Sequence, residues 1–410
     1  MSSMLVLIAG GGISGLLLAQ GLKRSGIDCV VLEREPADRR RSGYRLTLDA
    51  DGGNALEACL PPALYELYLR ASHVTPKRHD VAIVIDSQGR ELTTAPHLGP
   101  PNDGDRPHTA IDRRVFRQIL EAGLADDGTL RHDAAVTGFE QDDDRVHAIL
   151  ADGSTLTGDV LVGADGVGSA VRRALLPDVA IVPAPVGGLD LFGRSPVDDA
   201  ILAALPETIA SGFTIARDER GGLLAMGGYV PRQAPDAAAA AVAPGVRVDP
   251  IEPYMMILGG IRPGTTVPDP RAWTADTPRQ MHAGMMAVVA DWHPAIRGLV
   301  ERVEPGSIFA HPFRRLDPTP AWPTSRVTLV GDSIHAMLPT LGKGANMAMR
   351  NAAALRDALV TAARGDRPTA DALAAYEADM RAATYPIMEL AADHGRFGGG
   401  GLRKPERAPA

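Results

Sequence analysis

Short apolar runs and stretches of helical spacing alternate at the start of the chain. Residues 4–9 (MLVLIA) and 28–33 (DCVVLE) have the pattern of buried strands, and residues 13–24 between them have the pattern of a helix. A strand, a helix and a second strand within about 30 residues predict a β-α-β unit with parallel strands. The pattern returns late in the chain, where the apolar run 326–330 is followed by helical spacing through Ala358.

Between these two ends the pattern predicts further helices and strands. Residues 52–72 predict a helix that is broken at Pro61–Pro62, and residues 111–124 predict another helix. Residues 83–97 alternate as a hairpin does, and residues 134–162 predict strands with a turn at Asp152–Gly153.

Residues 180–315 differ from the rest of the chain in composition and hydrophobic pattern. They are rich in Gly and Pro, carry short strand-like runs, and contain an Ala-rich patch at 234–244 that we interpret as a flexible insertion. The alternation of strand and helix patterns returns from residue 326. Residues 371–395 then predict an amphipathic helix, and residues 396–410 predict a disordered tail. The prediction is an α/β protein: a discontinuous Rossmann-like domain, an inserted sheet domain and a C-terminal helix.

The predicted domain boundaries follow these changes in composition and pattern. The Rossmann-like domain comprises 1–72, 105–178 and 316–365, the sheet domain comprises 73–104 and 179–315, the C-terminal helix is 366–395, and the tail is 396–410.

Composition and charge narrow the function classes. The 410 residues are 45% apolar and 22% charged, which is ordinary for a globular protein, and the net charge of −8 opposes a nucleic-acid partner. Two cysteines make neither a disulfide framework nor a zinc site, and we expect no metal. The apolar N-terminal run lacks the positive flank and cleavage site of a signal peptide, and no apolar stretch approaches the roughly 20 residues of a membrane helix. We therefore expect a cytoplasmic protein without a membrane partner.

The first glycine motif is Gly10-x-Gly12-x-x-Gly15, between the first strand and the first helix. Such glycines allow a tight turn, a close approach of a pyrophosphate and close helix packing, and the helix N-terminus favours the phosphate charge. Glu33 ends the next strand, where it is placed to bind an adenosine ribose. The motif predicts a dinucleotide site, for either NAD or FAD.

Two later motifs also join a strand to a helix. In 158–177, Asp165–Gly166 ends a strand, Ser169 is placed to cap a helix and Arg172 lies in its first turns. Taken alone, this motif is also compatible with a simple capped corner.

The third motif is GDSIHAMLPTLGKGANMAMRN (331–351). Pro339 stiffens its loop, Gly342 and Gly344 let the backbone lie against a flat or bulky group, and a helix begins near Asn346. We interpret Lys343 as a solvated loop lysine and His335 as a packing residue.

In order and spacing, the three motifs resemble those of the single-component FAD-dependent aromatic hydroxylases, the flavoprotein monooxygenases of the para-hydroxybenzoate hydroxylase fold. The resemblance covers residues from about 4 to 390. It implies FAD as the cofactor. The cofactor-binding residues that it implies are Gly10, Gly12, Gly15, Glu33, the adjacent Arg34, Arg45, Arg113, Asp165, Asp332, Pro339, Gly342, Gly344 and Asn346.

Some implied roles are more specific. Asp332 resembles an acceptor for a ribityl hydroxyl, the helix after it faces the flavin pyrimidine, and Arg45 in SGYRLTLD (42–49) borders the isoalloxazine. One departure is Asn351, where the family often has an acid. The tetracycline-inactivating and antibiotic-tailoring relatives look like the nearest branch, and this departure leaves the fine substrate open.

The resemblance implies a reaction cycle in which NADPH or NADH reduces FAD, O₂ adds to give a flavin peroxide, and one oxygen atom passes to an organic substrate. Because the cofactor carries this chemistry, we name no catalytic protein residue. The expected partners are an apolar aromatic or polycyclic small molecule and O₂, for a monomer or homodimer. Hydroxylation, epoxidation and Baeyer–Villiger insertion stay open.

The substrate is expected between the flavin and the sheet domain. Apolar or soft side chains there are Phe192, Met226, Tyr229, Tyr254, Met256 and Phe313, each of which also suits plain core packing. We interpret Arg194 and Arg314 as surface residues rather than anchors of an acidic substrate. The alternatives to a monooxygenase are a flavin-fold isomerase or cyclase without redox turnover, an NAD-dependent dehydrogenase, and a protein that binds a natural product.

Overall fold

The computed structural model describes residues 4–37, 44–96, 110–183, 191–260, 267–311 and 313–394. The tail predicted at 396–410 lies outside these ranges.

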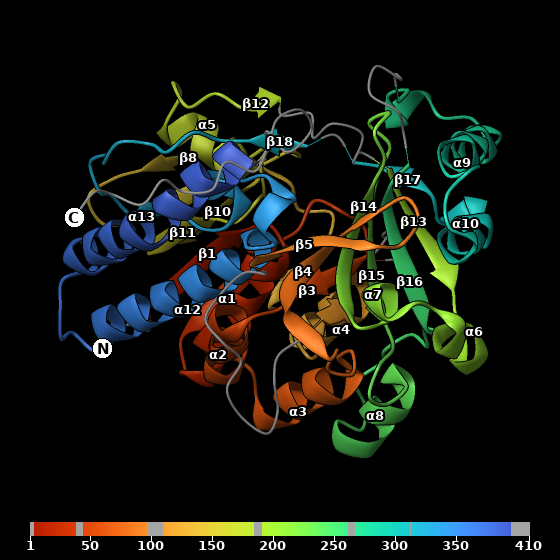
Figure 1. The fold of residues 1–410 in the computed structure, drawn as a ribbon. Coiled ribbons are helices and arrows are strands. Elements are labelled where there is room, and N and C mark those ends of the chain that lie inside the picture. The colour runs from red at the N-terminus through yellow and green to blue at the C-terminus, as the bar shows by residue number, and fades with distance from the viewer. Residues whose placement is uncertain are drawn as a thin grey trace, which may run out of the picture.

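A five-stranded parallel sheet forms the centre of one half of the molecule, which we call the first half (Figure 1). Its order is β19-β11-β1-β2-β7. The strands are β1 (Leu5–Ala9), β2 (Asp28–Leu32), β7 (Leu130–Arg131), β11 (Val160–Gly163) and β19 (Val327–Leu329). The chain places β2 on one side of β1 and later places β11 on the other side, so the strand order reverses at β1. The carboxyl ends of strands at such a reversal are where open α/β sheets hold ligands.

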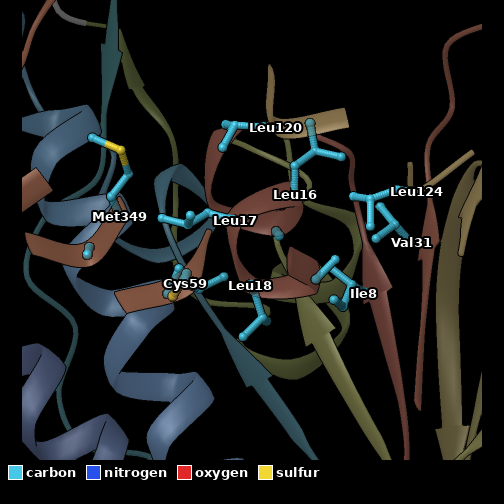
Figure 2. Packing of buried hydrophobic residues seen from close by; sticks show 14 of the residues in the cluster. Ile8, Leu16, Leu17, Leu18, Val31, Cys59, Leu120, Leu124 and Met349 are labelled. Atoms are coloured by element: carbon cyan, nitrogen blue, oxygen red, sulfur yellow. The ribbon is translucent and has the colours of Figure 1, made fainter. Parts of the chain in front are cut away.

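Helices from the beginning, the middle and the end of the chain surround this sheet. They are α1 (Ile13–Arg24), α2 (Ala50–Cys59), α4 (Arg113–Glu121), α5 (Ala170–Leu175), α12 (Gly344–Ala363) and α13 (Thr369–His394). Helix α12 packs against α1, α2 and α13, so the last part of the chain closes over the first. Figure 2 shows this core, in which Leu16, Leu17 and Leu18 of α1 lie between Ile8 of the sheet and Met349 of α12. Continuous apolar strands predict burial on both sheet faces, as observed.

Two smaller β-structures join this half. The antiparallel sheet β10-β9-β8 comprises β8 (Val136–Gln141), β9 (Val146–Leu150) and β10 (Thr155–Gly158). Strand β3 (Arg45–Thr47) pairs antiparallel with β6 (Ala110–Asp112), which leads directly into α4. The helix predicted at 111–124 is therefore shorter than expected, because its first two residues belong to β6.

A seven-stranded mixed sheet, of order β17-β13-β16-β15-β14-β4-β5, forms the second half. Its strands are β4 (Arg78–Asp86), β5 (Glu91–Pro96), β13 (Leu191–Pro196), β14 (Gly212–Arg217), β15 (Leu223–Tyr229), β16 (Tyr254–Gly259) and β17 (Phe309–Ala310). One face packs toward the first half, and α9 (Thr277–Val288) and α10 (Pro294–Glu301) cover the other (Figure 1). The predicted hairpin at 83–97 is β4–β5.

The remaining elements connect these layers. They are α3 (Pro62–Ala71), β12 (Val182–Pro183), α6 (Asp199–Ala204), α7 (Glu207–Ala210), α8 (Pro235–Val242), β18 (Arg314–Arg315), α11 (Asp332–His335) and three 3₁₀ turns at Pro270–Ala272, Pro305–Ser307 and Pro339–Leu341. The Ala-rich patch at 234–244 is not a flexible insertion as predicted. It forms α8, because Ala has the highest helix propensity and the buried Ala238 and Ala239 pack this helix near α3.

Within the described ranges, none of the helices has the length and apolar character needed to cross a membrane.

Candidate functional site

The first glycine motif forms a tight turn at the end of β1. Gly10 has φ of +102°, and a Cβ there would stand 2.5 Å from the carbonyl oxygen of Ala164 and 2.7 Å from the Cα of Asp165. A Cβ at Gly15 would collide with the carbonyl oxygen of Gly10. Gly12 is the N-cap of α1, makes no side-chain cap, and no acid lies in the first turn. The helix therefore offers uncapped N–H groups and positive dipole charge to an anion.

Glu33 lies beside this turn and is buried. Its carboxylate accepts hydrogen bonds from the backbone N–H of Gly11 at 2.8 Å and of Glu35 at 2.9 Å. Arg117 of α4 donates to the carbonyl oxygen of Gly11 and lies 3.8 Å from Glu33. The sequence analysis did not predict a role for Arg117, although Arg117 follows the predicted Arg113 by about one helical turn. Arg34, by contrast, has a 74% exposed side chain, paired to Glu35.

The second motif is tied to the third by a buried arginine. Asp165 accepts from the Ser169 hydroxyl and from the N–H of Ala170 at 2.7 Å, and Ser169 caps α5 by accepting from Arg172 N–H. The guanidinium of Arg172 is fully buried and donates to the carbonyl oxygen of Ser333 at 2.8 Å. The predicted cap is confirmed, and the motif is more than a capped corner because it fixes the loop after β19.

The third motif also contacts the first. Gly331 has φ of +69°, and a Cβ there would stand 2.6 Å from the hydroxyl oxygen of Ser14 in α1. Asp332 follows, with a side chain that solvent reaches. Burial nevertheless raises the pKa of this carboxyl, against the opposing charge of Arg113. Asp332 begins α11 directly after β19, so it lies at the carboxyl edge of the parallel sheet.

The side chain of Asn346 ties the start of α12 to the backbone of β3 and of the loop after it. Gly342 adopts φ of +61°, which ends the 3₁₀ turn at Pro339. Asn346 is buried, its amide donates to the carbonyl oxygen of Thr47 at 3.0 Å and to that of Gly342 at 3.1 Å, and its oxygen accepts from Asp49 N–H. Helix α12 begins at Gly344 without a side-chain cap or an acid in its first turn. A second helix N-terminus is thereby left open to a ligand.

Lys343 is not the solvated loop lysine that we predicted. It is 6% exposed, and its ammonium lies 2.6 Å from a carboxylate oxygen of Asp49 and 2.7 Å from one of Asp51. Burial alone would lower the pKa of Lys343, but the two carboxylates outweigh burial and raise it. The charged ammonium therefore joins the loop before α12 to the start of α2. The sequence carried a signal for this pairing in the two acids of LDAD, 48–51, which the prediction did not use.

His335 and Asn351 form a buried uncharged chain below this loop. Arg350 donates to the Asn351 oxygen at 3.1 Å, so the Asn351 amide donates to His335 Nε2 at 3.1 Å and to Thr384 of α13 at 2.9 Å. His335 Nε2 is then the acceptor, and Nδ1 carries the proton. Burial lowers the pKa of His335 to about 4. The packing role predicted for His335 agrees with this geometry, and Asn351 keeps the pair neutral where an acid would make it ionic.

Arg113 is the first residue of α4, and Arg45 is the first residue of β3. Arg113 is exposed, donates to the Tyr44 hydroxyl at 3.2 Å and stacks over the Tyr44 ring at 5.4 Å. The Tyr44 ring lies 4.7 Å from that of Phe192, which stacks on Phe309 at 5.1 Å between centroids. The cofactor-side loop and the seven-stranded sheet therefore meet through aromatic rings. Arg45 is buried beneath β15.

The six apolar residues predicted for the substrate do not share one environment. Phe192, Tyr229, Tyr254, Met256 and Phe313 belong to, or pack on, the core shared with the first half. Met226 belongs instead to the core beneath α9 and α10. Side chains alternate across a strand, so Met226 and Tyr229 of β15 point to opposite faces. We therefore leave Met226 out of the substrate site.

Arg194 is not a surface residue as predicted. Its guanidinium lies 2.9 Å from the carboxylate of Asp112 and 4.8 Å from the centre of the Tyr254 ring. Asp112 is fully buried, caps α4, and accepts from the Tyr254 hydroxyl at 2.8 Å. This cluster joins β13 and β16 to the start of α4. Arg314, in contrast, is exposed, as predicted.

Comparison with known proteins identifies the family. The family model described as "FAD binding domain" matches residues 3–45, 91–196 and 300–391, more than half of the chain. The chain belongs to this family. Its cofactor is therefore FAD, and the predicted resemblance to the FAD-dependent aromatic hydroxylases is confirmed, while the antibiotic-tailoring branch stays a prediction.

Individual relatives agree with this membership. The chain is 31% identical over 392 residues to the dual O-methyltransferase/FAD-dependent monooxygenase CTB3 of Cercospora beticola, covering 92% of this chain and 44% of that protein. The chain thus spans about half the length of the curated relatives that it matches. A putative FAD-containing monooxygenase from Photorhabdus luminescens has a similar structure, with a TM-score of 0.77, 26% identity, and coverage of 97% of this chain and 98% of that chain. HpxO of Klebsiella pneumoniae, solved with FAD and uric acid, shares the fold with a TM-score of 0.74, 21% identity and coverage of 97% and 89%.

Proposed function

We propose that the protein is an FAD-dependent monooxygenase that uses NADPH or NADH and O₂ to insert one oxygen atom into an apolar aromatic or polycyclic small molecule. The observation that carries this proposal is the meeting of two uncapped helix N-termini and the open Asp332 carboxyl at one sheet edge, opposite aromatic rings of a second sheet. Two positive helix ends suit a long anionic dinucleotide, and the rings suit a flat apolar substrate.

The chain's own residues fit the parts of FAD as follows in this proposal. The α1 N-terminus and Gly10, Gly12 and Gly15 hold the pyrophosphate, and Glu33 takes the adenosine ribose once its bonds to Gly11 and Glu35 rearrange. Asp332 accepts from a ribityl hydroxyl, and the α12 N-terminus favours negative charge on the pyrimidine edge. Asp165 and Asn346 act by holding the loops rather than by direct contact, because their polar atoms are engaged with the protein.

Bound FAD supplies the activation of oxygen. The protein's contribution is to orient the substrate and exclude water, and the stack of Tyr44, Phe192 and Phe309 provides an apolar wall for both. No described side chain is required as a general base in this proposal. The domain boundaries predicted from the sequence, and a cytoplasmic location, remain part of the proposal.

The test is a screen of NADPH and NADH oxidation with the FAD-loaded protein and sets of phenolic and polyketide compounds. A monooxygenase oxidises the nicotinamide faster with one compound class and returns a product heavier by one oxygen atom. A yellow protein that transforms a compound without consuming nicotinamide would instead be the cyclase or isomerase of the same fold. A yellow protein that only binds compounds would be a binding protein, and a protein that refuses FAD would contradict the whole proposal.

A further inference from the structure

Arg117 of α4 contacts the glycine turn at the end of β1 through the backbone of that turn. Its guanidinium donates to the carbonyl oxygen of Gly11, and it also lies 3.8 Å from the carboxylate of Glu33 and 2.5 Å from that of Glu121. The side chain of Arg117 is 14% exposed, so most of it lies within the protein. One charged side chain therefore joins α4 to the turn that precedes α1.

Helix α4 is fixed against α1, so Arg117 starts from a defined place. The buried Gln20 of α1 donates through its amide to the carbonyl oxygens of Leu120 and Ala122, at 2.9 Å each. Leu120 also belongs to the buried core that contains Leu16 of α1 (Figure 2). A side chain that extends from a fixed helix can orient a neighbouring peptide better than one on a mobile loop.

Both polar groups of the Gly11 backbone are held by side chains. Its N–H donates to the Glu33 carboxylate at 2.8 Å, and its carbonyl oxygen accepts from Arg117. In a planar trans peptide, the carbonyl and the following N–H point in opposite directions. Arg117 therefore fixes the direction of the Gly12 N–H, which belongs to the uncapped N-terminus of α1. This matters because a peptide between two glycines rotates easily when nothing holds it.

Arg117 also changes the charge beside this turn. Glu33 and Glu121 each place a carboxylate within ion-pair distance of its guanidinium. A carboxylate near the α1 N-terminus repels a negative phosphate, and the guanidinium that pairs with both acids offsets part of this repulsion. A neutral residue at position 117 would leave both acids near the turn without this cation.

We propose that Arg117 is a positioning residue for FAD, which holds the Gly11 carbonyl and thereby aims the Gly12 N–H at the pyrophosphate. The inference rests on the proposed function, which places the pyrophosphate at the α1 N-terminus, and it adds a residue of α4 to that site. Arg117 acts through the backbone of the turn and does not itself contact FAD. Its effect should therefore fall on the half of the cofactor that carries the phosphates, and not on the flavin half.

The experiment measures how tightly the full chain, freed of flavin, binds FAD, with the quenching of flavin fluorescence as the signal. The proteins are wild type, Arg117→Met, Arg117→Lys and Glu121→Gln. We expect Arg117→Met to weaken FAD binding about tenfold or more, because the turn loses a charge-assisted hydrogen bond. Arg117→Lys keeps the charge and a donor, so it should recover part of the loss. Glu121→Gln removes only the more exposed partner of Arg117 and should bind FAD within about twofold of wild type.

Two competitors separate a role at the turn from a general loosening of the site. ADP carries the adenosine and the pyrophosphate of FAD, and riboflavin carries the flavin without phosphate. In Arg117→Met the inhibition constant of ADP against FAD should rise by about the same factor as the Kd of FAD, and that of riboflavin should stay within about twofold of wild type. A merely structural role would weaken both competitors alike.

Other outcomes overturn the proposal. They are an unchanged FAD affinity in Arg117→Met, an equal loss in Glu121→Gln, or an equal weakening of ADP and riboflavin. If Arg117→Met does not fold, Arg117→Lys decides: weaker FAD and ADP binding with riboflavin unchanged supports the proposal, and wild-type affinity contradicts it. If no compound stimulates NADPH or NADH oxidation, the proposed function fails, whereas the FAD affinities of these variants still decide the role of Arg117.

Discussion

The parallel-sheet half and the seven-stranded sheet differ in what holds their functional groups in place. In the parallel half, the FAD-binding groups that we propose include backbone N–H atoms at two helix ends, and glycines such as Gly10 and Gly331 shape the turns beside them by their positive φ. In the mixed sheet, polar side chains are held by partners distant in sequence, as Arg194 of β13 is held by Asp112 of β6. The first kind of site depends on residues that have no substitute, whereas the second depends on pairs.

The largest effect is expected from breaking the backbone site. Gly10→Ala adds a Cβ 2.5 Å from the Ala164 carbonyl oxygen in a residue with φ of +102°. Because backbone atoms cannot move aside as side chains do, we expect loss of FAD binding and a fall of about 3 kcal/mol in unfolding free energy. The measurements are FAD content after purification and urea unfolding.

The matched control for that variant is Gly26→Ala. Gly26 also has positive φ, at +74°, but no atom lies within 4 Å of an added Cβ. Its strain should cost about 1–2 kcal/mol with FAD content unchanged. Equal loss of FAD in both variants would show that overall stability, rather than the shape of the turn, controls cofactor binding.

The second prediction breaks a side-chain pair of the other half. Arg194→Met leaves the fully buried Asp112 without its cation, so the unfolding free energy should fall by about 3 kcal/mol. Arg314→Met removes an exposed arginine of the same region and should change it by less than about 0.5 kcal/mol. Urea unfolding of both variants checks this, and similar values for the two would contradict the role of the Asp112 cluster.

The difference between local backbone features and distant side-chain pairs also explains which parts of the structure could be predicted from the sequence. The β-α-β unit, the Ser169 cap and the hairpin β4–β5 depend on neighbours within a few residues, and the sequence predicted each of them. The positions of the charged groups of Arg194 and Lys343 depend on ion-pair partners far along the chain. From the sequence alone, both side chains were predicted to be exposed.

Helix and strand periodicity also left the sheet faces undecided. Met226 and Met256 are equally apolar, yet strand pairing places them in different cores. The prediction of a flexible insertion at 234–244 was wrong for a related reason. A low-complexity sequence resembles a linker until its packing partner, here α3, is known.

The third prediction concerns pH and the buried His335. Its folded-state pKa of about 4 lies below the ordinary value of 6.5, so below pH 6.5 the unfolded chain binds a proton that the folded chain does not. His335 should therefore cost stability as pH falls from 6.5 toward 4, by about 2 kcal/mol between pH 7.5 and 5. The difference in unfolding free energy between wild type and His335→Gln should shrink by that amount. His147→Gln, in the antiparallel sheet β10-β9-β8, serves as the control, and an offset for His335→Gln that is constant with pH would refute the prediction.

The smallest effects should come from the two methionines, and they sharpen the comparison within the mixed sheet itself. Met226→Leu and Met256→Leu are the same nearly volume-conserving change on neighbouring strands, so each should cost less than about 1.5 kcal/mol. Met256 lies on the face toward the aromatic rings, whereas Met226 lies beneath α9 and α10. Met256→Leu should therefore change the KM for the compound that best stimulates NADPH or NADH oxidation, and Met226→Leu should not. If Met226→Leu alone changed KM, the substrate would have to approach from the α9–α10 side, and the proposed position of the flavin opposite the aromatic rings would be wrong.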